Sequence, residues 1–161
     1  MCAITIREAT PEDVAILANN LREEDKQEAS AQWGSAQEGT AIASTGTVLF
    51  AIQKSYDVSK DRFTMDLRGK PIAMFGLVEN DKDTANIWLL GTPDLAKIKK
   101  SFIILSVEII KEFLAEYPTL WAQVDRRYQK TFRWLKWLGA IEQPTYKLNG
   151  VDFNNFVFRR A

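Results

Sequence analysis

The fold is decided by the stretch that begins Ile87-Trp88-Leu89-Leu90-Gly91-Thr92-Pro93-Asp94 and ends at Tyr117-Pro118. Its first five residues are apolar or glycine and predict a buried strand. Thr92-Pro93-Asp94 has the cap hydroxyl, the proline and the early carboxylate that are typical of a helix start. Proline disfavours a helical conformation in the residue before it, so we expect the helix to end at Tyr117. The next apolar run, Leu120–Val124, predicts a second strand.

The long helix predicted between these strands has one broad apolar face. At about 100° per residue its apolar side chains fall in a single arc, with the charged residues opposite or at its edges. The arc contains Leu95, Ile98, Phe102, Ile103, Leu105, Val107, Ile109, Ile110, Phe113 and Leu114. Such a helix packs on a sheet, and ligands of strand-helix-strand units bind where the strand meets the helix N-terminus. The turn Gly91–Asp94 is therefore the first candidate position for a site.

The remaining sequence alternates between strand and helix patterns. Gly69 and Gly150 each lie between two apolar runs and predict hairpin turns. The strand after Gly69 is apolar on both faces and should be central, and Gly76 within it indicates a bulge or a close approach by another group. The charged run Arg22–Gln32 is either the exposed face of a continued first helix or a second short helix, and only its alanines and the adjacent Trp33 could be buried. The other expected elements are an edge strand at Ile4–Arg7, a helix from Pro11, a loop at Gly34–Gly46, a helix rather than a strand at Thr47–Ile52, strands at Phe63–Leu67 and Ile72–Val78, a short helix at Lys130–Leu138, and closing strands at Thr145–Leu148 and Phe153–Phe158.

Length and composition favour one globular domain over residues 1–161. The chain is 46% hydrophobic and 26% charged, and its 21 basic and 21 acidic residues cancel. A net charge of zero gives no electrostatic footprint for nucleic acid, so we do not expect a nucleic-acid partner. No apolar run is long enough to span a membrane, and Met1–Ile4 lacks a secretory signal pattern, so we expect a cytoplasmic protein.

Histidine is absent from the sequence, and Cys2 is the one cysteine. Without histidine the chain cannot form a serine-histidine or cysteine-histidine nucleophile pair, and we expect no metal site of the usual nitrogen and sulfur ligands. A single thiol also excludes an internal disulfide. Any catalysis must therefore use carboxylate, tyrosine, lysine or backbone groups.

Several segments together resemble the GNAT family of N-acetyltransferases over nearly the whole chain. They are Arg7-Glu8-Ala9-Thr10, the Gly69-Lys70-Pro71 hairpin, the strand and long helix of the opening stretch, and Trp134–Ala140. The resemblance implies an α/β fold with a central, mixed, mostly antiparallel twisted sheet that is flanked by helices on both faces. Fold membership alone does not give the activity, so the site is considered residue by residue.

A second set of segments is similar to the acetyltransferase-like proteins of tailed bacteriophages, a group that includes an internal virion protein of short-tailed coliphages. These segments are Ile87–Thr92, Tyr117–Trp121, Val124-Asp125-Arg126 and Phe132–Gly139. This narrower resemblance implies a virion or assembly protein, located in the virion or the host cytoplasm. Its partners would be other virion or assembly proteins, with a homo-oligomer as an open alternative.

In active GNAT enzymes the turn after the fourth strand carries glycines whose N–H groups cradle the pyrophosphate of acetyl-coenzyme A. Here Pro93 has no N–H, Asp94 brings a negative charge, and no glycine follows Gly91 in the turn. We therefore expect an acyl-coenzyme A site without function, and no cofactor. The alternative is an active N-acetyltransferase that uses acetyl-coenzyme A. Its cofactor-binding groups would be the backbone of Leu90, Gly91 and Thr92 together with Lys99.

Three lysines near the helix start could neutralise phosphate in place of the missing glycines. They are Lys97, Lys99 and Lys100. Lys99 is the strongest candidate because it falls near the middle of the apolar arc in an early turn of the helix. In a purely structural role, its aliphatic stem would lie along apolar surface while its ammonium group reached water.

The catalytic positions of the family are altered as well. Active members often present an asparagine at the start of the short helix and a tyrosine on it, which protonates the departing thiolate. Counting back from Gly139, Tyr128 stands at the asparagine position and Leu135, which cannot be an acid, at the tyrosine position. The remaining catalytic candidates are Tyr128 and Glu79, the latter as a base near the end of the third strand. In structural roles, Tyr128 would be a partly buried ring at a helix start and Glu79 a solvated carboxylate.

Trp137 is the main candidate for a protein contact. On the short helix it projects between cationic residues, and tryptophan and arginine are enriched among interface hot spots. The predicted partner-binding residues are Trp137, Arg133, Arg126 and Arg127. The competing interpretation is that the closing hairpin, which carries Phe153, Phe156 and Phe158, covers Trp137.

Overall fold

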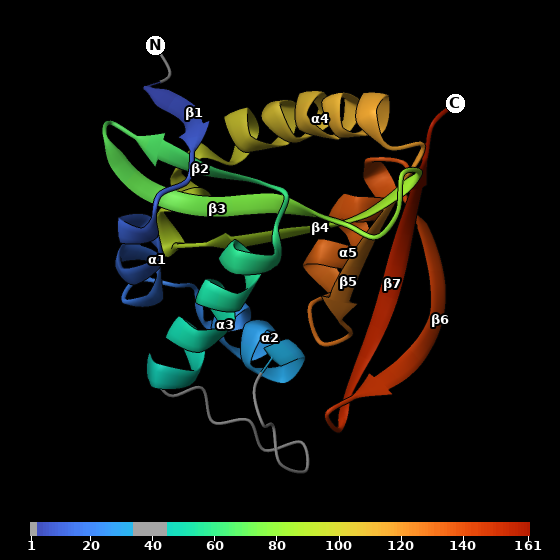
Figure 1. Cartoon of the computed structure of the whole chain (residues 1–161), viewed down its shortest axis with the longest axis horizontal. Coiled ribbons are helices and arrows are strands. Elements are labelled where there is room, and N and C mark those ends of the chain that lie inside the picture. Colours follow the sequence, from blue (N-terminus) through green and yellow to red (C-terminus); the bar gives the residue numbers. More distant parts are fainter. Residues whose placement is uncertain (1–2, 34–44) are drawn as a thin grey trace.

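The computed structural model describes residues 3–33 and 45–161 (Figure 1). The loop predicted at Gly34–Gly46 lies outside the described residues, except for its last two positions, which already belong to a helix. In chain order the elements are β1 (Ile4–Glu8), α1 (Pro11–Ala18), α2 (Glu23–Trp33), α3 (Thr45–Val58), β2 (Asp61–Leu67), β3 (Lys70–Glu79), β4 (Thr84–Gly91), the 3₁₀ helix η2 (Pro93–Ile98), α4 (Lys99–Glu116), β5 (Thr119–Asp125), α5 (Gln129–Trp137), β6 (Ile141–Leu148) and β7 (Val151–Arg159). The element order matches the sequence prediction, and the charged run forms a separate helix, α2.

One seven-stranded sheet carries the fold, in the order β1-β2-β3-β4-β5-β7-β6. Every neighbouring pair is antiparallel except β4 and β5, which are parallel. The sheet is therefore mixed and mostly antiparallel, as predicted. Strand β3 lies in its interior and is almost entirely buried, which agrees with its apolar sequence on both faces.

Helices cover both faces of this sheet, because successive side chains of a strand point to opposite sides. Met74 of β3 packs in a core cluster with α1 and α3. Its neighbour Phe75 faces the other way, into a cluster with α4 and α5. On β7 the same alternation places Phe153 against Ala31 of α2 and Phe156 against α5. Helices α1, α2 and α3 thus lie on one face, and α4 and α5 on the other (Figure 1).

The helix predicted to begin at Thr92-Pro93-Asp94 begins as the 3₁₀ helix η2. Pro93 occupies its first position as expected, but the Thr92 side chain makes no cap hydrogen bond. Ile98 leaves the helical region with φ −119° and ψ 28°, and the α-helix α4 starts only at Lys99. The short break places Lys99 in the first turn of the α-helix rather than in its second.

The parallel strands β4 and β5 separate along their length. They pair only over Thr84–Ile87 of β4 and Thr119–Ala122 of β5. Beyond these residues β4 continues to pair with β3 on one side, and β5 continues with β7 on the other. Figure 1 shows the two strands running apart toward their carboxyl ends. This separation opens the middle of the sheet at the turn that the sequence marks as a candidate site.

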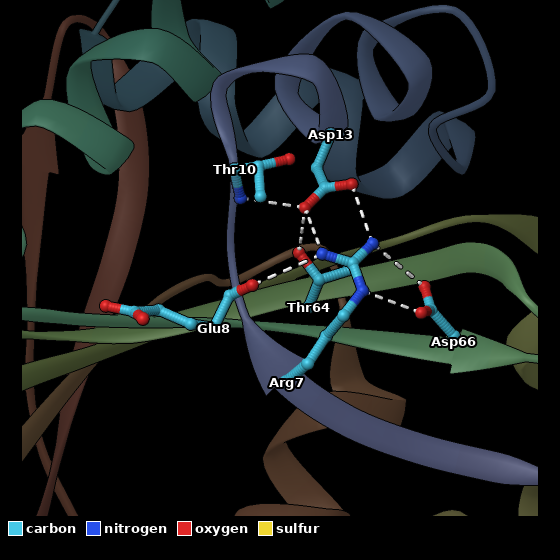
Figure 2. A network of polar contacts seen from close by, with 6 residues as sticks. All are labelled: Arg7, Glu8, Thr10, Asp13, Thr64 and Asp66. Carbon is cyan, nitrogen blue, oxygen red and sulfur yellow. Dashed lines mark hydrogen bonds and ion pairs between the residues drawn. The ribbon is translucent and has the colours of Figure 1, made fainter.

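The start of α1 is held to the sheet edge by a network of charged and polar groups (Figure 2). The Arg7 guanidinium of β1 donates to both carboxylate oxygens of Asp13, each at 2.8 Å, and its Nε donates to Asp66 of β2 at 2.7 Å. Asp13 is almost fully buried and also accepts hydrogen bonds from the Thr10 N–H and the Thr64 hydroxyl, each at 2.8 Å. Asp13 thus caps its own helix and joins it to β1 and β2.

Glycine 76 of β3 is a point of close approach. A Cβ atom at this position would lie 2.6 Å from the backbone oxygen of Asp61 and 3.0 Å from Trp88 Nε1. The irregularity between β2 and β3 lies instead between Met65 and Asp66. Of the two sequence interpretations of Gly76, close approach is therefore confirmed.

Within the described residues, no helix has the length and apolar character needed to cross a membrane.

Candidate functional site

A cleft of about 1540 Å³ occupies the opening between β4 and β5. Its walls come from the carboxyl ends of both strands, from α4 and α5 on one face of the sheet, and from α2 on the other. The wall between α4 and α5 is aromatic, since the rings of Phe102 and Trp134 lie 5.4 Å apart. The cleft therefore connects the two faces of the sheet at its centre, and its two ends differ in charge.

Cations line the end of the cleft that is formed by α4 and α5. Lys99 lies in the first turn of α4, and Lys130 and Arg133 lie on α5. All three are exposed, and none forms an ion pair with another described residue. Three unpaired cations on facing helices provide a site for an anionic ligand. Lys99 and Arg133, predicted to belong to a cofactor site and a partner-binding site respectively, thus line the same cleft.

Asp94, which is predicted to place a negative charge where phosphates would bind, forms ion pairs with two lysines. Its carboxylate pairs with Lys97 at 2.9 Å and with Lys70 at 3.2 Å. These two lysines lower the pKa of Asp94 through hydrogen bonds. The residue is absent from the cleft lining among the described residues, although Pro93 and Lys99 are part of it. The electrostatic obstacle expected from Asp94 is thus neutralised by its neighbours.

The backbone groups predicted to hold a cofactor already have partners within the protein. The Gly91 N–H donates to Asp25 Oδ2 at 2.8 Å, and the Thr92 N–H donates to the Ile72 carbonyl oxygen at 2.8 Å. Leu90 pairs with Met74 of β3. The sequence could not indicate these contacts, since Asp25 and Gly91 are 66 positions apart.

Leu89 presents its backbone to the cleft instead. The Gly91 N–H donates to Asp25 of α2, and the Gly91 carbonyl oxygen accepts from the N–H of Arg22, the residue before α2. Both backbone groups of Gly91 therefore point away from β3. Residues two apart in a strand share this orientation, which turns the N–H and C=O of Leu89 the same way. The described pairing with β5 ends at Ile87, and Leu89 lines the cleft. A strand edge with backbone donor and acceptor groups is therefore exposed to a ligand.

Carboxylates line the end of the cleft that is formed by α2 and β5. They belong to Glu23, Glu24, Asp25 and Glu28, and of these Asp25 is buried. The buried Asp125 of β5 lies next to Glu28 but is not part of the described lining. Burial raises the pKa of Asp25, against the opposing effect of Arg22, whose Nε donates to Asp25 at 2.7 Å. Arg127 Nε donates to Asp125 Oδ1 at 3.0 Å. The burial of Asp25 corrects the prediction that only apolar residues of this run are buried.

Glu28 lines the cleft beside Asp25. Its pKa is raised well above the ordinary glutamate value, first by burial and then by the neighbouring carboxylates of Asp25 and Asp125. A carboxylate with a raised pKa holds a proton more readily than an ordinary glutamate does. The sequence does not single out Glu28, because an acidic residue in a highly charged helix has no local signal that separates it from surface glutamates.

Tyr128 lies in the cleft beside these carboxylates. It precedes α5, and its hydroxyl donates to Gln27 Oε1 of α2 at 2.9 Å. Burial raises the pKa of Tyr128 to about 12, so the phenol is protonated at neutral pH. Leu135, at the position of the family's tyrosine, is buried in the core. Tyr128 is the one described tyrosine that lines the cleft.

Glu79 lies elsewhere in the structure. It ends β3, where its carboxylate accepts a hydrogen bond from the Tyr117 hydroxyl at 2.9 Å and lies 4.0 Å from Lys60 Nζ. In the described structure it does not line the cleft, so Glu79 and Tyr128 are not brought together.

The predicted partner-binding residues are also separated by the structure. Trp137 is 64% exposed, so the interpretation that the closing hairpin covers it is wrong. Arg133 is exposed on the same helix and lines the cleft. Arg127 is paired with Asp125, and Arg126 donates to Thr145 Oγ1 at 2.8 Å. Trp137 and Arg133 are therefore accessible together, whereas the two arginines before α5 make contacts within the protein.

No protein-family model matches the sequence, and no curated protein sequence matches it significantly. Solved structures do match. AAC(6')-Ib in complex with ribostamycin and coenzyme A aligns over 98% of this chain and 94% of its own, with a TM-score of 0.69 and 17% identity. A mutant of the spermidine N-acetyltransferase SpeG from Vibrio cholerae aligns over 98% and 94%, with a TM-score of 0.64 and 13% identity. The Campylobacter jejuni N-acetyltransferase PseH aligns over 99% of both chains, with a TM-score of 0.61 and 16% identity.

These alignments extend over nearly the whole chain, and they show that it has the GNAT acetyltransferase fold. The predicted fold class is thereby confirmed, including the mixed sheet with helices on both faces. At such low sequence identity, structural similarity shows the fold but not the activity.

Proposed function

We propose that the protein is an N-acyltransferase that transfers an acyl group from an acyl-coenzyme A to a cationic amine. The observation that carries this proposal is the bipolar cleft between β4 and β5. Lys99, Lys130 and Arg133 line it on the face of α4 and α5, and Asp25 and Glu28 line it on the face of α2. An anionic acyl donor suits the first end and an ammonium group suits the second.

The residues of the cleft fit acetyl-coenzyme A, although the glycine-rich turn is missing. The exposed backbone edge at Leu89 can bind an amide-containing chain as a further strand would bind. Lys99, Lys130 and Arg133 supply positive charge for phosphates where other members of the fold use backbone N–H groups. In this class of reaction the bound cofactor supplies an acyl group as a thioester.

Two side chains of the cleft can manage the protons of amide formation. Glu28 accepts a proton from the ammonium group of the acceptor, which frees the nitrogen lone pair for attack on the acyl carbon. The Tyr128 hydroxyl donates a proton to the leaving sulfur as the carbon-sulfur bond breaks, and its raised pKa keeps it protonated until that step. The resulting phenolate takes the second proton from the nitrogen as the amide forms, and Glu28 releases the first proton to solvent. The acidic end of the cleft favours amines with positive charge. The spermidine N-acetyltransferase among the structural neighbours has a substrate of this class.

Calorimetry with acetyl-coenzyme A tests the first half of the proposal. A dissociation constant tighter than about 100 μM, roughly 5.5 kcal/mol, is expected for the wild-type chain. Because an exposed ion pair contributes up to about 1 kcal/mol, Lys99→Gln should weaken binding by up to about fivefold. Lys111→Gln, the same change on the exposed side of α4, is the matched control. No binding by the wild-type chain would refute the proposal and support the non-functional site predicted from the turn.

Acyl transfer to a panel of amines tests the second half. Glu28→Gln should lower kcat at least about 100-fold, the usual effect of losing a general base, without changing the affinity for acetyl-coenzyme A. Glu108→Gln, on the solvent side of α4, should leave both quantities unchanged. An unchanged kcat in Glu28→Gln would remove Glu28 from the mechanism.

A second candidate function is a protein contact in a bacteriophage particle or in its assembly, which follows from the narrower sequence resemblance. The exposure of Trp137 beside Arg133 favours it, since both residue types are frequent at the centres of interfaces. Mass spectrometry of purified particles is the direct test. Absence of the chain from particles, together with acyltransferase activity in the host cytoplasm, would exclude this candidate.

A further inference from the structure

Helix α5 carries an exposed tryptophan in line with its cleft-lining cations. At about 100° per residue, Trp137 falls on the helix surface between Arg133 on one side and Lys130 and Trp134 on the other. All three of those residues line the cleft. Trp137 therefore points to the same side of α5, about 6 Å further along the helix axis than Arg133 at 1.5 Å per residue.

This tryptophan is not needed by the core. It is 64% exposed, and the residue after it, Leu138, is the one that joins the cluster of α4 and α5. Trp134, one turn earlier, packs against Phe102 and forms the aromatic wall of the cleft. A large aromatic ring left in solvent beside unpaired cations has the composition of a nucleotide site, in which cations hold phosphates and an aromatic face stacks on a base.

We propose that Trp137 is the platform for the adenine base of coenzyme A, with Lys130 and Arg133 on the adjoining phosphates. The proposal rests on the acyl-coenzyme A function proposed above and assigns the nucleotide half of that ligand. The order of these side chains along α5 favours a nucleotide, because phosphates match the two cations and a flat base matches the indole ring that follows them. A protein segment would have to supply acidic and apolar groups in the same order.

The test compares ligands with and without the nucleotide. The dissociation constants of acetyl-coenzyme A, S-acetyl phosphopantetheine and adenosine 3′,5′-bisphosphate are measured for the wild-type chain, Trp137→Ala and Trp137→Phe. Stacking of one base on an aromatic side chain contributes roughly 5-fold to 150-fold in affinity, and one exposed ring should give the lower part of this range. Trp137→Ala should therefore weaken acetyl-coenzyme A and the bisphosphate about fivefold to tenfold. S-acetyl phosphopantetheine should stay within twofold, and Trp137→Phe should recover most of the loss. Ile104→Ala, at a residue of α4 that is 67% exposed, controls for the removal of exposed apolar surface.

The outcomes separate this proposal from the function on which it rests. If the wild-type chain binds acetyl-coenzyme A and Trp137→Ala binds it equally well, the adenine platform is overturned and the acyltransferase function stands. Equal weakening of all three ligands would mean that Trp137 shapes the whole cleft, which also overturns the proposal. Loss of a virion-protein contact in Trp137→Ala, with unchanged affinity for acetyl-coenzyme A, would assign the ring to a protein interface. If the wild-type chain binds none of the ligands, both proposals fail together.

Discussion

Replacing Asp13 by asparagine should remove a pH-dependent part of the stability of the protein. Asp13 is 2% exposed and lies at the centre of the network in Figure 2. Burial alone would raise the pKa of its carboxyl group. The Arg7 guanidinium, the Thr10 N–H and the Thr64 hydroxyl outweigh burial, and together they lower the pKa from 3.8 to about 2. Asparagine has nearly the same shape but cannot carry the charge that Arg7 binds.

The magnitude follows from the difference between the native and unfolded pKa values. A depression from 3.8 to about 2, at 1.36 kcal/mol per unit, corresponds to about 2 kcal/mol of folding stability. Because the native pKa is the lower one, this contribution is present above pH 3.8 and is lost as the pH falls toward 2. It should fall to roughly half by pH 3. Asp13→Asn lacks it at every pH, so the difference between variant and wild type should shrink on acidification.

Urea unfolding followed by tryptophan fluorescence at pH 7 and pH 3 measures this difference. Asp13→Asn should be about 2 kcal/mol less stable than the wild type at pH 7 and about 1 kcal/mol less stable at pH 3. Asp57→Asn, the same change at an exposed position of α3, should have little effect at either pH. A stability difference that is the same at both pH values would show that the Asp13 charge does not contribute, and that the variant acts through packing alone.

Three further substitutions test the close contacts of Gly76 and Asp25. Gly76→Ala should destabilise the fold by about 1–3 kcal/mol in urea unfolding, because the added Cβ would lie 2.6 Å from the backbone oxygen of Asp61, which cannot move aside. A loss of stability below about 0.5 kcal/mol would contradict this prediction. Asp25→Ala should lower the stability by about 1–3 kcal/mol, because the buried Gly91 N–H loses its acceptor. Asp25→Asn keeps a side-chain oxygen for this hydrogen bond and removes a charge that burial disfavours. This second variant should therefore be at least as stable as the wild type at pH 7. Equal losses in the two Asp25 variants would show that the charge, and not the hydrogen bond, holds α2 to β4.

Most of the architecture could be predicted from local patterns. The central position of β3 follows from its apolar character on both faces, and the end of α4 at Glu116 follows from Pro118. The start of α4 and the end of α3 are both displaced from the prediction, because α4 begins at Lys99 and α3 continues to Val58. Thr92-Pro93-Asp94 has the composition of a helix start, but the backbone first forms a 3₁₀ helix, in which Leu95 packs against Gly91.

The candidate site could be predicted only in part. Lys99 and Tyr128 line the cleft, and so does Pro93 of the turn after β4, whereas Gly91, Thr92 and Asp94 are absent from its described lining. Glu28 and Asp25 could not be found, because their role depends on where α2 rests against β4 and β5. The prediction that Asp94 would repel phosphates rests on its charge alone, whereas in the structure Lys70 and Lys97 neutralise that charge.

The sequence by itself determined the order of the elements and the strand-helix-strand unit at Ile87–Val124, since periodicity, proline and glycine act over a few residues. Only the tertiary structure decided that β4 and β5 separate, and that Asp25 of α2 and Arg22, the residue before it, bond to the N–H and the C=O of Gly91. It also decided that Trp137 remains exposed on α5. These features join residues far apart in the chain, so they depend on how complete elements pack together rather than on any local pattern.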